Sequence, residues 1–126
     1  MNIDILKNIW AAIYDPQKDI LAVLDEFFHH DYEQCINGVI MFRPEYINHV
    51  SAQKKDVVIE HIDYKHFLEN GDELFALYYP KGKTAKGSDI EAEVIGYFQF
   101  KDKKLLKIHA QVRMLKGEFS DVDMQN

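Results

Sequence analysis

The sequence contains a single cysteine, Cys35, among its 126 residues, so no disulfide can form within the chain. It also has no excess of positive charge, since 15 lysines and arginines against 21 aspartates and glutamates give a net charge of -6. Binding to nucleic-acid phosphates needs clustered positive potential, so this balance argues against a nucleic-acid partner. A lone cysteine fits a reducing compartment, and we expect a cytoplasmic protein.

Long apolar runs and phosphate-binding loops are missing as well. The first ten residues, MNIDILKNIW, carry Asp4 and Lys7 and have no apolar core, so we expect neither a secretory signal nor a membrane span. Gly82 and Gly87 flank a lysine-rich stretch, but no helix start follows them, as a phosphate site would require. We therefore expect no nucleotide and no other cofactor.

Histidine is the one residue type that raises the question of a metal. The six histidines lie at positions 29, 30, 49, 61, 66 and 109. No pair has the i, i+4 spacing of a zinc-binding helix. His61 and His66 would face opposite sides of a regular strand, and His29 and His30 would diverge at the end of a helix. We therefore expect no metal site.

What the chain does contain is enough apolar material for one core. Hydrophobic residues make up 47% of the sequence and aromatic residues 13%, which argues against disorder. A chain of this length forms one domain. We predict a single domain over residues 1–119, followed by a polar tail over residues 120–126 that frays from Ser120 onward.

The first half of the chain has the periodicity of helices. Ile5, Ile9 and Ile13 fall at helical spacing and predict an amphipathic helix over residues 3–14. Asp15 and Pro16 are suited to the cap and first position of a second helix, with His29 and His30 in its last turn. Pro44 is predicted to open a third helix that carries Tyr46, Ile47 and Val50 along one side.

The second half has the pattern of strands. Residues 32–36 predict a short strand that ends at the Asn37-Gly38 turn, and Asn70-Gly71 is a hairpin signal. The predicted long strands cover residues 57–68, 74–79, 91–100 and 105–115. A loop is expected over residues 81–88 because of its two glycines. The order predicts an α+β domain with three helices packed on an antiparallel sheet of four long strands plus one short strand.

Two stretches carry a resemblance to a known group of proteins. They are the run DY…NGVIM…PEYINHV, between Asp31 and Val50, and the closing segment FQFKDKKLLKIHAQV. Together with the element order over residues 3–116, they resemble the NTF2-like superfamily, which includes ketosteroid isomerases and SnoaL-type polyketide cyclases. The resemblance implies a cone formed by the helices and a curved sheet, an apolar cavity inside it, and a homodimer.

Alternation along the last two strands predicts which face lines that cavity. In the final strand Ile108, Ala110 and Val112 share one side, and the uniformly apolar side has the most to gain from burial under the helices. The opposite side is mixed. We predict that it forms the homodimer interface, or otherwise an ordinary solvated face, through Ile95, Tyr97, His109 and Gln111.

The resemblance does not extend to the ketosteroid isomerase reaction. Those enzymes place a carboxylate base at the end of the short strand and a donor carboxyl on the next-to-last long strand. The matching positions here hold Cys35 and Gly96. A tyrosine of their first helix falls near Trp10, and Tyr14 lies one turn later. The proton-transfer residues of that reaction are therefore absent.

The SnoaL-type resemblance implies an acidic residue in the cavity, and the available carboxylates are Asp31, Glu33 and Glu60. Glu33 is the predicted acid/base because burial would raise its pKa, although a solvated edge position is the simpler interpretation. His49 is the second predicted acid/base. Beside His49, Cys35 could be activated as a thiolate, but a lone cysteine is more often a small buried filler.

These considerations predict a pocket for a hydrophobic or aromatic small molecule, lined by residues that are also candidates for simple core packing. The predicted lining is Trp10, Tyr14, Tyr32, Cys35, Met41, Tyr46, Phe98, Ala110 and Val112. The implied reaction class is a cofactor-free isomerase or cyclase. The alternative is a non-catalytic dimerisation or protein-interaction module that uses the mixed sheet face.

Overall fold

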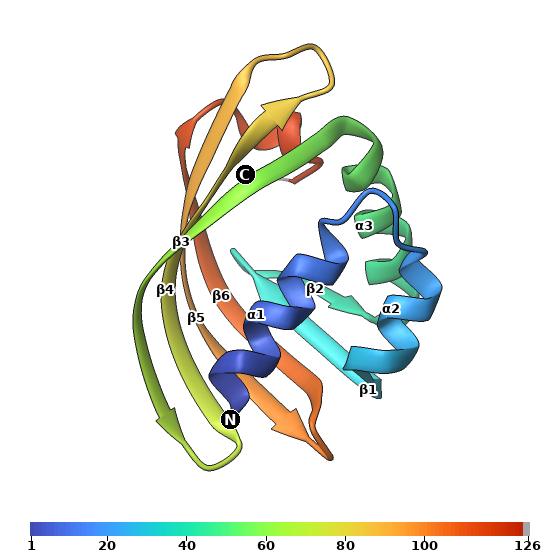
Figure 1. Cartoon of the computed structure of the whole chain (residues 1–126), viewed down its shortest axis with the longest axis vertical. Helices are drawn as coiled ribbons and strands as arrows, with labels where there is room; N and C mark the ends of the chain where they lie inside the picture. Colours follow the sequence, from blue (N-terminus) through green and yellow to red (C-terminus); the bar gives the residue numbers. More distant parts are fainter. Residues whose placement is uncertain (125–126) are drawn as a thin grey trace.

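The computed structural model describes residues 1–124, in which three α-helices lie on one side of a curved six-stranded sheet (Figure 1). The elements in chain order are α1 (Asn2–Ile13), α2 (Ile20–Phe27), β1 (Phe28–Ile36), β2 (Val39–Phe42), α3 (Arg43–Asp56), β3 (Val57–Asn70), β4 (Glu73–Thr84), β5 (Asp89–Lys101), β6 (Lys104–Lys116) and the 3₁₀ helix η1 (Phe119–Val122). The predicted α+β class is confirmed.

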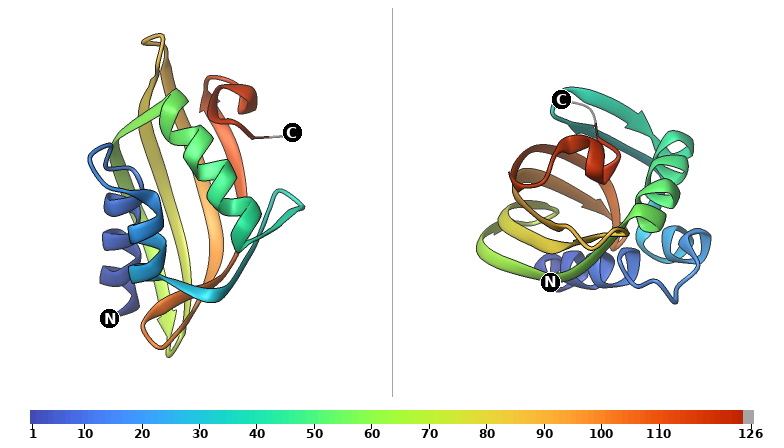
Figure 2. Two further views of the ribbon diagram at one scale, coloured as in Figure 1. Left: turned by 90° about the vertical axis from the view of Figure 1, so that its right-hand side faces the viewer. Right: turned by 90° about the horizontal axis from the view of Figure 1, so that it is seen from above.

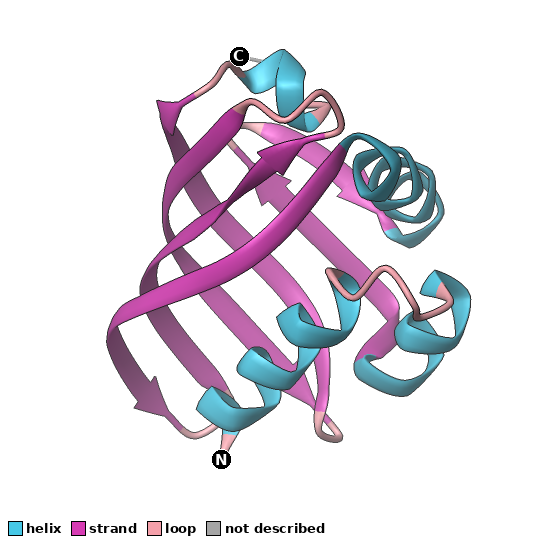
Figure 3. Cartoon of the chain, turned by 45° about the horizontal axis from the view of Figure 1, so that its top comes forward, coloured by secondary structure: helices cyan, strands magenta, loops and turns pink. Residues whose placement is uncertain are grey.

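The sheet has the strand order β2-β1-β6-β5-β4-β3. All neighbouring pairs are antiparallel except β1 and β6, which run parallel. The sheet is therefore mixed, not purely antiparallel as predicted. Register shifts interrupt the pairing of β3 with β4 and of β5 with β6. Such irregularities bend strands, and the sheet curves around the helices (Figures 2 and 3).

The apolar side of β5 and β6 faces the helices, as the alternation predicted. Phe98, Leu105 and Ile108 are buried there with Leu6 and Ile13 of α1. The opposite side of the same strands leaves Ile95 and His109 exposed. Residues that alternate along one strand thus lie in two different environments.

The start of the second helix differs from the prediction. Asp19, not Asp15, is the N-cap, and its carboxylate accepts a hydrogen bond from the Ala22 N–H. Asp15 instead accepts a bond from the Gln17 N–H within a turn that contains Pro16. The Asp-Pro pair suits the first position of a turn as well as of a helix, so the sequence signal was ambiguous.

The end of that helix was also misplaced. α2 stops at Phe27, and the chain passes directly into β1 at Phe28. His29 and His30 therefore lie on a strand, and the prediction that they occupy the last helical turn is wrong. Just past this end, the guanidinium of Arg43 donates to the carbonyl oxygens of both Phe28 and His29 and holds them in the strand. A distant side chain thus binds backbone acceptors that lie just past the helix end.

Two further strand boundaries were missed. The Asn37-Gly38 turn, with φ of 51° and 81°, joins β1 to β2 as a hairpin, although only the first strand was predicted. The loop predicted over residues 81–88 is shorter, because β4 continues to Thr84. Gly82 belongs to this strand. A glycine is needed there because a Cβ at this position would overlap the backbone of Val58 on β3.

Part of the segment predicted as a polar tail is folded against the domain. Residues 119–122 form η1, and Val122 is buried against Val57 and Ile90. The side chain of Gln53 donates a hydrogen bond to the Val122 carbonyl and fastens η1 to α3. Residues 125 and 126 of the predicted tail lie outside the described residues.

Candidate functional site

The space between the helices and the concave side of the sheet contains a cavity of about 200 Å³. Its walls come from α1, β1, β2, α3 and the inner faces of β3 to β6, with residues 122–124 at one end. An apolar cavity of about 150 Å³ is large enough to take up benzene. The cavity here therefore has room for a compact molecule that contains an aromatic ring.

Most of the predicted lining residues meet in this cavity. They are Trp10, Tyr14, Met41, Tyr46, Ala110 and Val112, and the predicted acid/base His49 joins them from α3. Trp10 and Tyr14 lie one turn apart on α1, with ring centroids 6.0 Å apart. Ala110 and Val112 alternate along β6 and form part of the floor. Three separate segments of the sequence thus converge on one apolar space.

Two predicted lining residues belong to the core behind the cavity wall. Tyr32 and Phe98 are 1% and 0% exposed, and neither reaches the cavity surface. Tyr32 packs against Phe28 and Tyr46, with ring centroids 4.8 and 5.3 Å away. Phe98 packs beside Tyr78, which does line the cavity. Both residues shape the pocket indirectly by fixing the rings in front of them.

Glu33 and Cys35 do not line the cavity, and the interpretation of Glu33 as its acid/base is not supported by its position. The carboxylate of Glu33 lies 3.5 Å from Lys107 Nζ, and both side chains are 43% exposed. Tyr32 and Gln34, between which Glu33 lies, are buried. Because side chains alternate along β1, Glu33 and Cys35 point to the outer side of the sheet.

Gln34 is a buried polar lining residue that the sequence does not predict. It is 4% exposed, and its Oε1 accepts a hydrogen bond of 2.7 Å from the Tyr32 hydroxyl. Its Nε2 lies 3.9 Å from Met41 Sδ, across the wall of the cavity. Alternation puts Gln34 on the side of Tyr32 and opposite to Glu33, but the residue pattern of β1 does not show which of the two sides is the inner one.

The cavity also contains a hydrogen-bond donor, Trp10 Nε1, which has no well-formed partner. It lies near Tyr78, where the larger effect of burial raises the pKa and a hydrogen bond from Trp10 acts to lower it. Trp10 Nε1 is, among the described residues, the buried side-chain nitrogen or oxygen that has no hydrogen-bond partner. The Trp10 side chain lines the cavity and the residue is 7% exposed. An unsatisfied buried donor costs about 1–3 kcal/mol, so buried polar groups in folded proteins are nearly always paired. This nitrogen is the natural partner for an acceptor atom of a bound molecule.

The tyrosines around the cavity are held in the neutral form. Burial raises the pKa of Tyr14 to about 12 and raises the pKa values of Tyr46 and Tyr78 well above the usual range. Nearby tyrosine hydroxyls add to the effect, because one tyrosinate would destabilise the next. At neutral pH these side chains are therefore hydrogen-bond donors and not bases.

His49 is the imidazole on the cavity wall. It is partly buried on α3, one turn from Tyr46, and their ring centroids are 6.4 Å apart. Desolvation by burial lowers the pKa of His49 below its ordinary value of 6.5. The neutral imidazole therefore predominates at pH 7, and in this form it can accept a proton.

A pair of carboxyl groups lies at the end of the cavity formed by the C-terminal segment. Asp123 lines the cavity, and partial desolvation followed by the adjacent Asp56 carboxyl raises its pKa. The backbone of Asp123 is left-handed, with φ of 58°, directly after η1. The sequence does not predict this pair, because its pattern indicates a polar tail over residues 120–126.

Comparison with known proteins shows which fold this architecture represents. No protein-family model matches the chain, and no curated protein matches it in sequence. Solved structures do match. A protein from Rhodopseudomonas palustris provisionally named an isomerase superposes with a TM-score of 0.75 at 13% identity, over 97% of this chain and 93% of its own.

Two further structures agree with this match. A protein from Jannaschia sp. CCS1, provisionally named a SnoaL-like polyketide cyclase, has a TM-score of 0.71 at 10% identity, covering 88% of this chain and 84% of its own. An NTF2-like protein from Burkholderia xenovorans LB400 has a TM-score of 0.65 at 16% identity, covering 91% of both chains. The chain therefore has the NTF2-like fold, and the predicted resemblance is confirmed at the level of fold. Within residues 1–124, no helix has the length and apolar character needed to cross a membrane.

Proposed function

We propose that the protein binds a small hydrophobic or aromatic molecule in the cavity between its helices and its sheet. The observation that carries this proposal is the Trp10 Nε1 donor, which lacks a well-formed partner in a mostly apolar wall. An apolar pocket with a few polar groups that fix orientation is the usual form of a small-molecule site. Structural neighbours named as an isomerase and a polyketide cyclase support it further.

The lining also defines the kind of molecule that fits. Trp10 Nε1, Gln34 Nε2 and the neutral tyrosines offer donors, so the ligand carries a neutral acceptor such as a carbonyl or ether oxygen. Its size is limited to about one or two rings by a volume of about 200 Å³.

The proposal extends to cofactor-free proton transfer, as an isomerase or cyclase would require. His49 is the acid/base in this proposal, because its neutral form predominates at pH 7 and it lies on the cavity wall. Tyr46 or Tyr14 would donate a hydrogen bond to the oxygen on which charge develops. Glu33 has no part in it, since it pairs with Lys107 outside the cavity.

A matched pair of probes tests the binding proposal. Acetophenone and ethylbenzene have similar size, but only acetophenone carries a carbonyl acceptor. We expect calorimetry to show one equivalent of acetophenone bound, with at least about fivefold weaker binding of ethylbenzene, because it leaves the donor unpaired. A Val112→Phe variant, which fills the floor of the cavity, should abolish binding of both probes.

Gln111→Phe is the matched control, because residue 111 lies next to Val112 on β6 but is exposed on the outer face. It should bind acetophenone like the unaltered chain. Equal binding by the Val112→Phe variant would place the probe elsewhere and would contradict the proposal. His49→Ala and Tyr46→Phe variants that fold normally and bind unchanged would remove these two residues from the site.

A second candidate function rests on the outer face of the sheet. Ile95 and Phe75 are each 54% exposed on neighbouring strands, and the Phe75 ring lies 5.3 Å from that of Tyr97. With His109 and Gln111, these residues form an apolar centre with a polar edge, which is typical of protein interfaces. We propose a homodimer through this face. If the cavity binds nothing, a non-catalytic dimerisation or interaction module is the remaining function.

The cytoplasm is the location we propose. This location is supported by Cys35, the only cysteine of the chain, which is a free thiol.

A further inference from the structure

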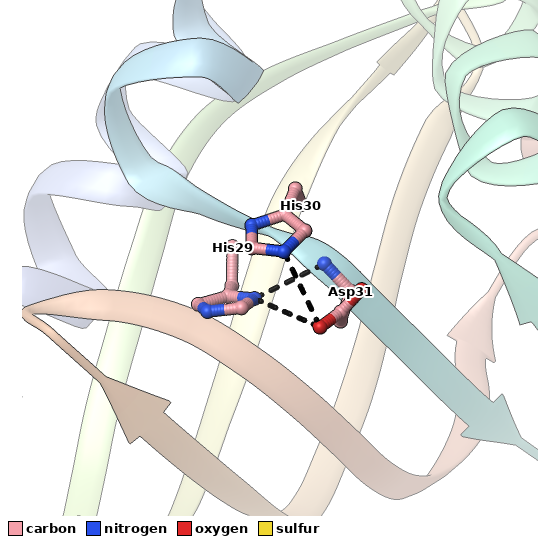
Figure 4. Close-up of side chains that lie close together, drawn as sticks. All are labelled: His29, His30 and Asp31. Carbon is pink, nitrogen blue, oxygen red and sulfur yellow. Dashed lines mark hydrogen bonds and ion pairs between the residues drawn. The ribbon is translucent and has the colours of Figure 1, made fainter.

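A second group of chemically competent side chains lies at the start of β1, at residues that do not line the cavity. His29, His30 and Asp31 are consecutive, yet one ligand atom from each lies within 4.8 Å of those of the other two (Figure 4). The imidazole rings of His29 and His30 are stacked, with centroids 4.3 Å apart and planes at 26°. In a regular strand, neighbouring side chains would point to opposite faces.

An irregularity of β1 explains how these three side chains come together. Phe28 is paired with Leu105 and Glu33 with Lys107, so five steps along β1 correspond to two along β6. The intervening residues therefore leave the regular register. Irregularities of this kind redirect side chains and are frequent near functional sites.

The backbone of this segment is fixed from outside the strand. Arg43 Nη1 donates to the carbonyl oxygens of Phe28 and His29 at 2.9 and 3.0 Å, and Nη2 pairs with Asp25 at 3.1 Å. The charge of Arg43 is thus balanced by Asp25 and does not stand alone next to the cluster. The side chain of His29 is 8% exposed, whereas those of His30 and Asp31 are 82% and 71% exposed. One ligand is therefore anchored in the core and two face solvent.

The distances suit a small divalent ion. Ligand atoms bound tetrahedrally to zinc at 2.0–2.2 Å lie about 3.4 Å from one another. His30 Nε2 and Asp31 Oδ2 are 3.4 Å apart, and His29 Nδ1 lies 4.0 Å from the same oxygen. Closing the separation between His29 and Asp31 requires movement of about half an ångström. The two imidazole rings are stacked with planes at 26°, so the His30 ring must also rotate before both ring nitrogens point at one ion. The exposed side chains of His30 and Asp31 can make this movement by rotation.

Coordination by His29 changes one hydrogen bond. Its Nδ1 now accepts the backbone N–H of Asp31 at 3.0 Å. A metal at Nδ1 would take this lone pair, and the part-buried Asp31 N–H would need another acceptor, such as water. Two imidazole nitrogens and one carboxylate oxygen form a ligand set that favours zinc over magnesium or calcium, with the remaining coordination position left to solvent.

We propose that His29, His30 and Asp31 form a binding site for a divalent transition-metal ion such as Zn²⁺, separate from the cavity. On a helix His29 and His30 would diverge, as the sequence predicts, but the strand places their rings side by side. The ion would lock the junction of α2 and β1, so its role is stabilising or regulatory and not catalytic.

Titration of the whole chain with zinc chloride, followed by calorimetry and thermal unfolding, tests this site. We expect one equivalent of zinc to bind and to raise the unfolding temperature, because the ion binds the folded chain preferentially. His30→Ala and Asp31→Asn should each weaken binding by at least about tenfold. Both residues are exposed, so these variants are expected to fold, whereas removing the buried His29 puts folding at risk.

His66→Ala is the matched control, because His66 is an exposed histidine on β3. It should bind zinc with unchanged affinity. An equal loss in the His66→Ala variant, or no binding by the unaltered chain, would overturn the proposal. Zinc-dependent association of two chains that His30→Ala prevents would also overturn it, since the ion would then bridge molecules.

Discussion

The two faces of β5 and β6 show how one sheet can build both a container and a water-exposed surface. On the inner face, Phe98 and Ile108 are register partners and are 0% and 2% exposed. On the outer face, Tyr97 and His109 are the next pair, and His109 is exposed. A shift of one residue along the strand changes the environment completely, which is why the pattern of alternation is so informative here.

The tyrosine hydroxyls of the two faces are kept protonated by different interactions. On the outer face, the hydroxyls of Tyr97 and Tyr79 donate 2.7 Å hydrogen bonds to Glu73 and Glu93. These carboxylates raise the pKa values of the tyrosines by stabilising their O–H form. On the inner face burial has the same effect on Tyr14. Tyrosines of the outer face are thus kept neutral by hydrogen bonds to carboxylates, and Tyr14 of the inner face is kept neutral by burial away from water.

Removal of one phenylalanine from each face tests this comparison with the largest expected effect. Phe98→Ala should lower the free energy of unfolding by about 3–5 kcal/mol, because it leaves a void in the core. Phe75→Ala, at a half-exposed position on the outer face, should cost less than about 1 kcal/mol. Urea unfolding measures both. Similar losses would mean that the two faces are not distinguished by packing.

The free energy of unfolding above pH 10 tests whether burial keeps Tyr14 neutral. An unfolded chain loses the Tyr14 proton near pH 10.0, whereas the folded chain keeps it to about pH 12. This contribution to stability is complete below pH 10 and is lost as the pH rises toward 12, by about 2–3 kcal/mol. Tyr14→Phe should flatten the loss of unfolding free energy over this range, as followed by urea titrations.

The comparison variant for this experiment is Tyr97→Phe, which should flatten the same curve by less because Tyr97 faces solvent. An unchanged slope in the Tyr14→Phe variant would show that Tyr14 is not held in the neutral form by burial.

Removal of the Trp10 N–H donor should have a smaller effect, on ligand affinity. Trp10→Phe keeps an aromatic ring in the wall but removes Nε1, and we expect acetophenone binding to weaken by about 1 kcal/mol, or about fivefold. Ethylbenzene binding should change much less, because it makes no hydrogen bond. Calorimetry with both probes checks this. Equal weakening for the two probes would assign the effect to shape and not to the donor.

The outer face gives the smallest expected effect on folding but a clear effect on assembly. Ile95→Lys should change the unfolding of a single chain by less than about 0.5 kcal/mol. It should nevertheless convert the proposed dimer to a monomer at micromolar concentration in a sedimentation experiment. Leu68→Lys, at a 76% exposed position outside the proposed interface, should remain dimeric. A monomeric unaltered chain would refute the dimer.

The sequence predicted the inner face well because β5 and β6 alternate over many residues between apolar and polar side chains. It predicted the face of β1 poorly. Residues 32–36 hold apolar or polar side chains on both sides, and only the pairing of Gln34 with Ile108 shows which side is inner. Glu33 was therefore assigned to the cavity and Gln34 was missed.

The other misses depend on contacts between residues far apart in the chain. Arg43 binds the carbonyls of Phe28 and His29 just past α2 from 15 and 14 residues away, and Gln53 binds the Val122 carbonyl of η1 from 69 residues away. The stacking of His29 and His30 follows from an irregular register with β6. Local patterns contain none of this information, because each feature arises only when the strands pair.

The central claim is that the inner face encloses a space open to a small molecule, and Trp10 reports on it directly because it is the only tryptophan of the chain. Titration with acetophenone should change Trp10 emission along a saturable curve that ends at one equivalent, and Val112→Phe should eliminate the saturable change. A strictly linear loss of emission, parallel to that of free N-acetyltryptophanamide, would show that no such site exists.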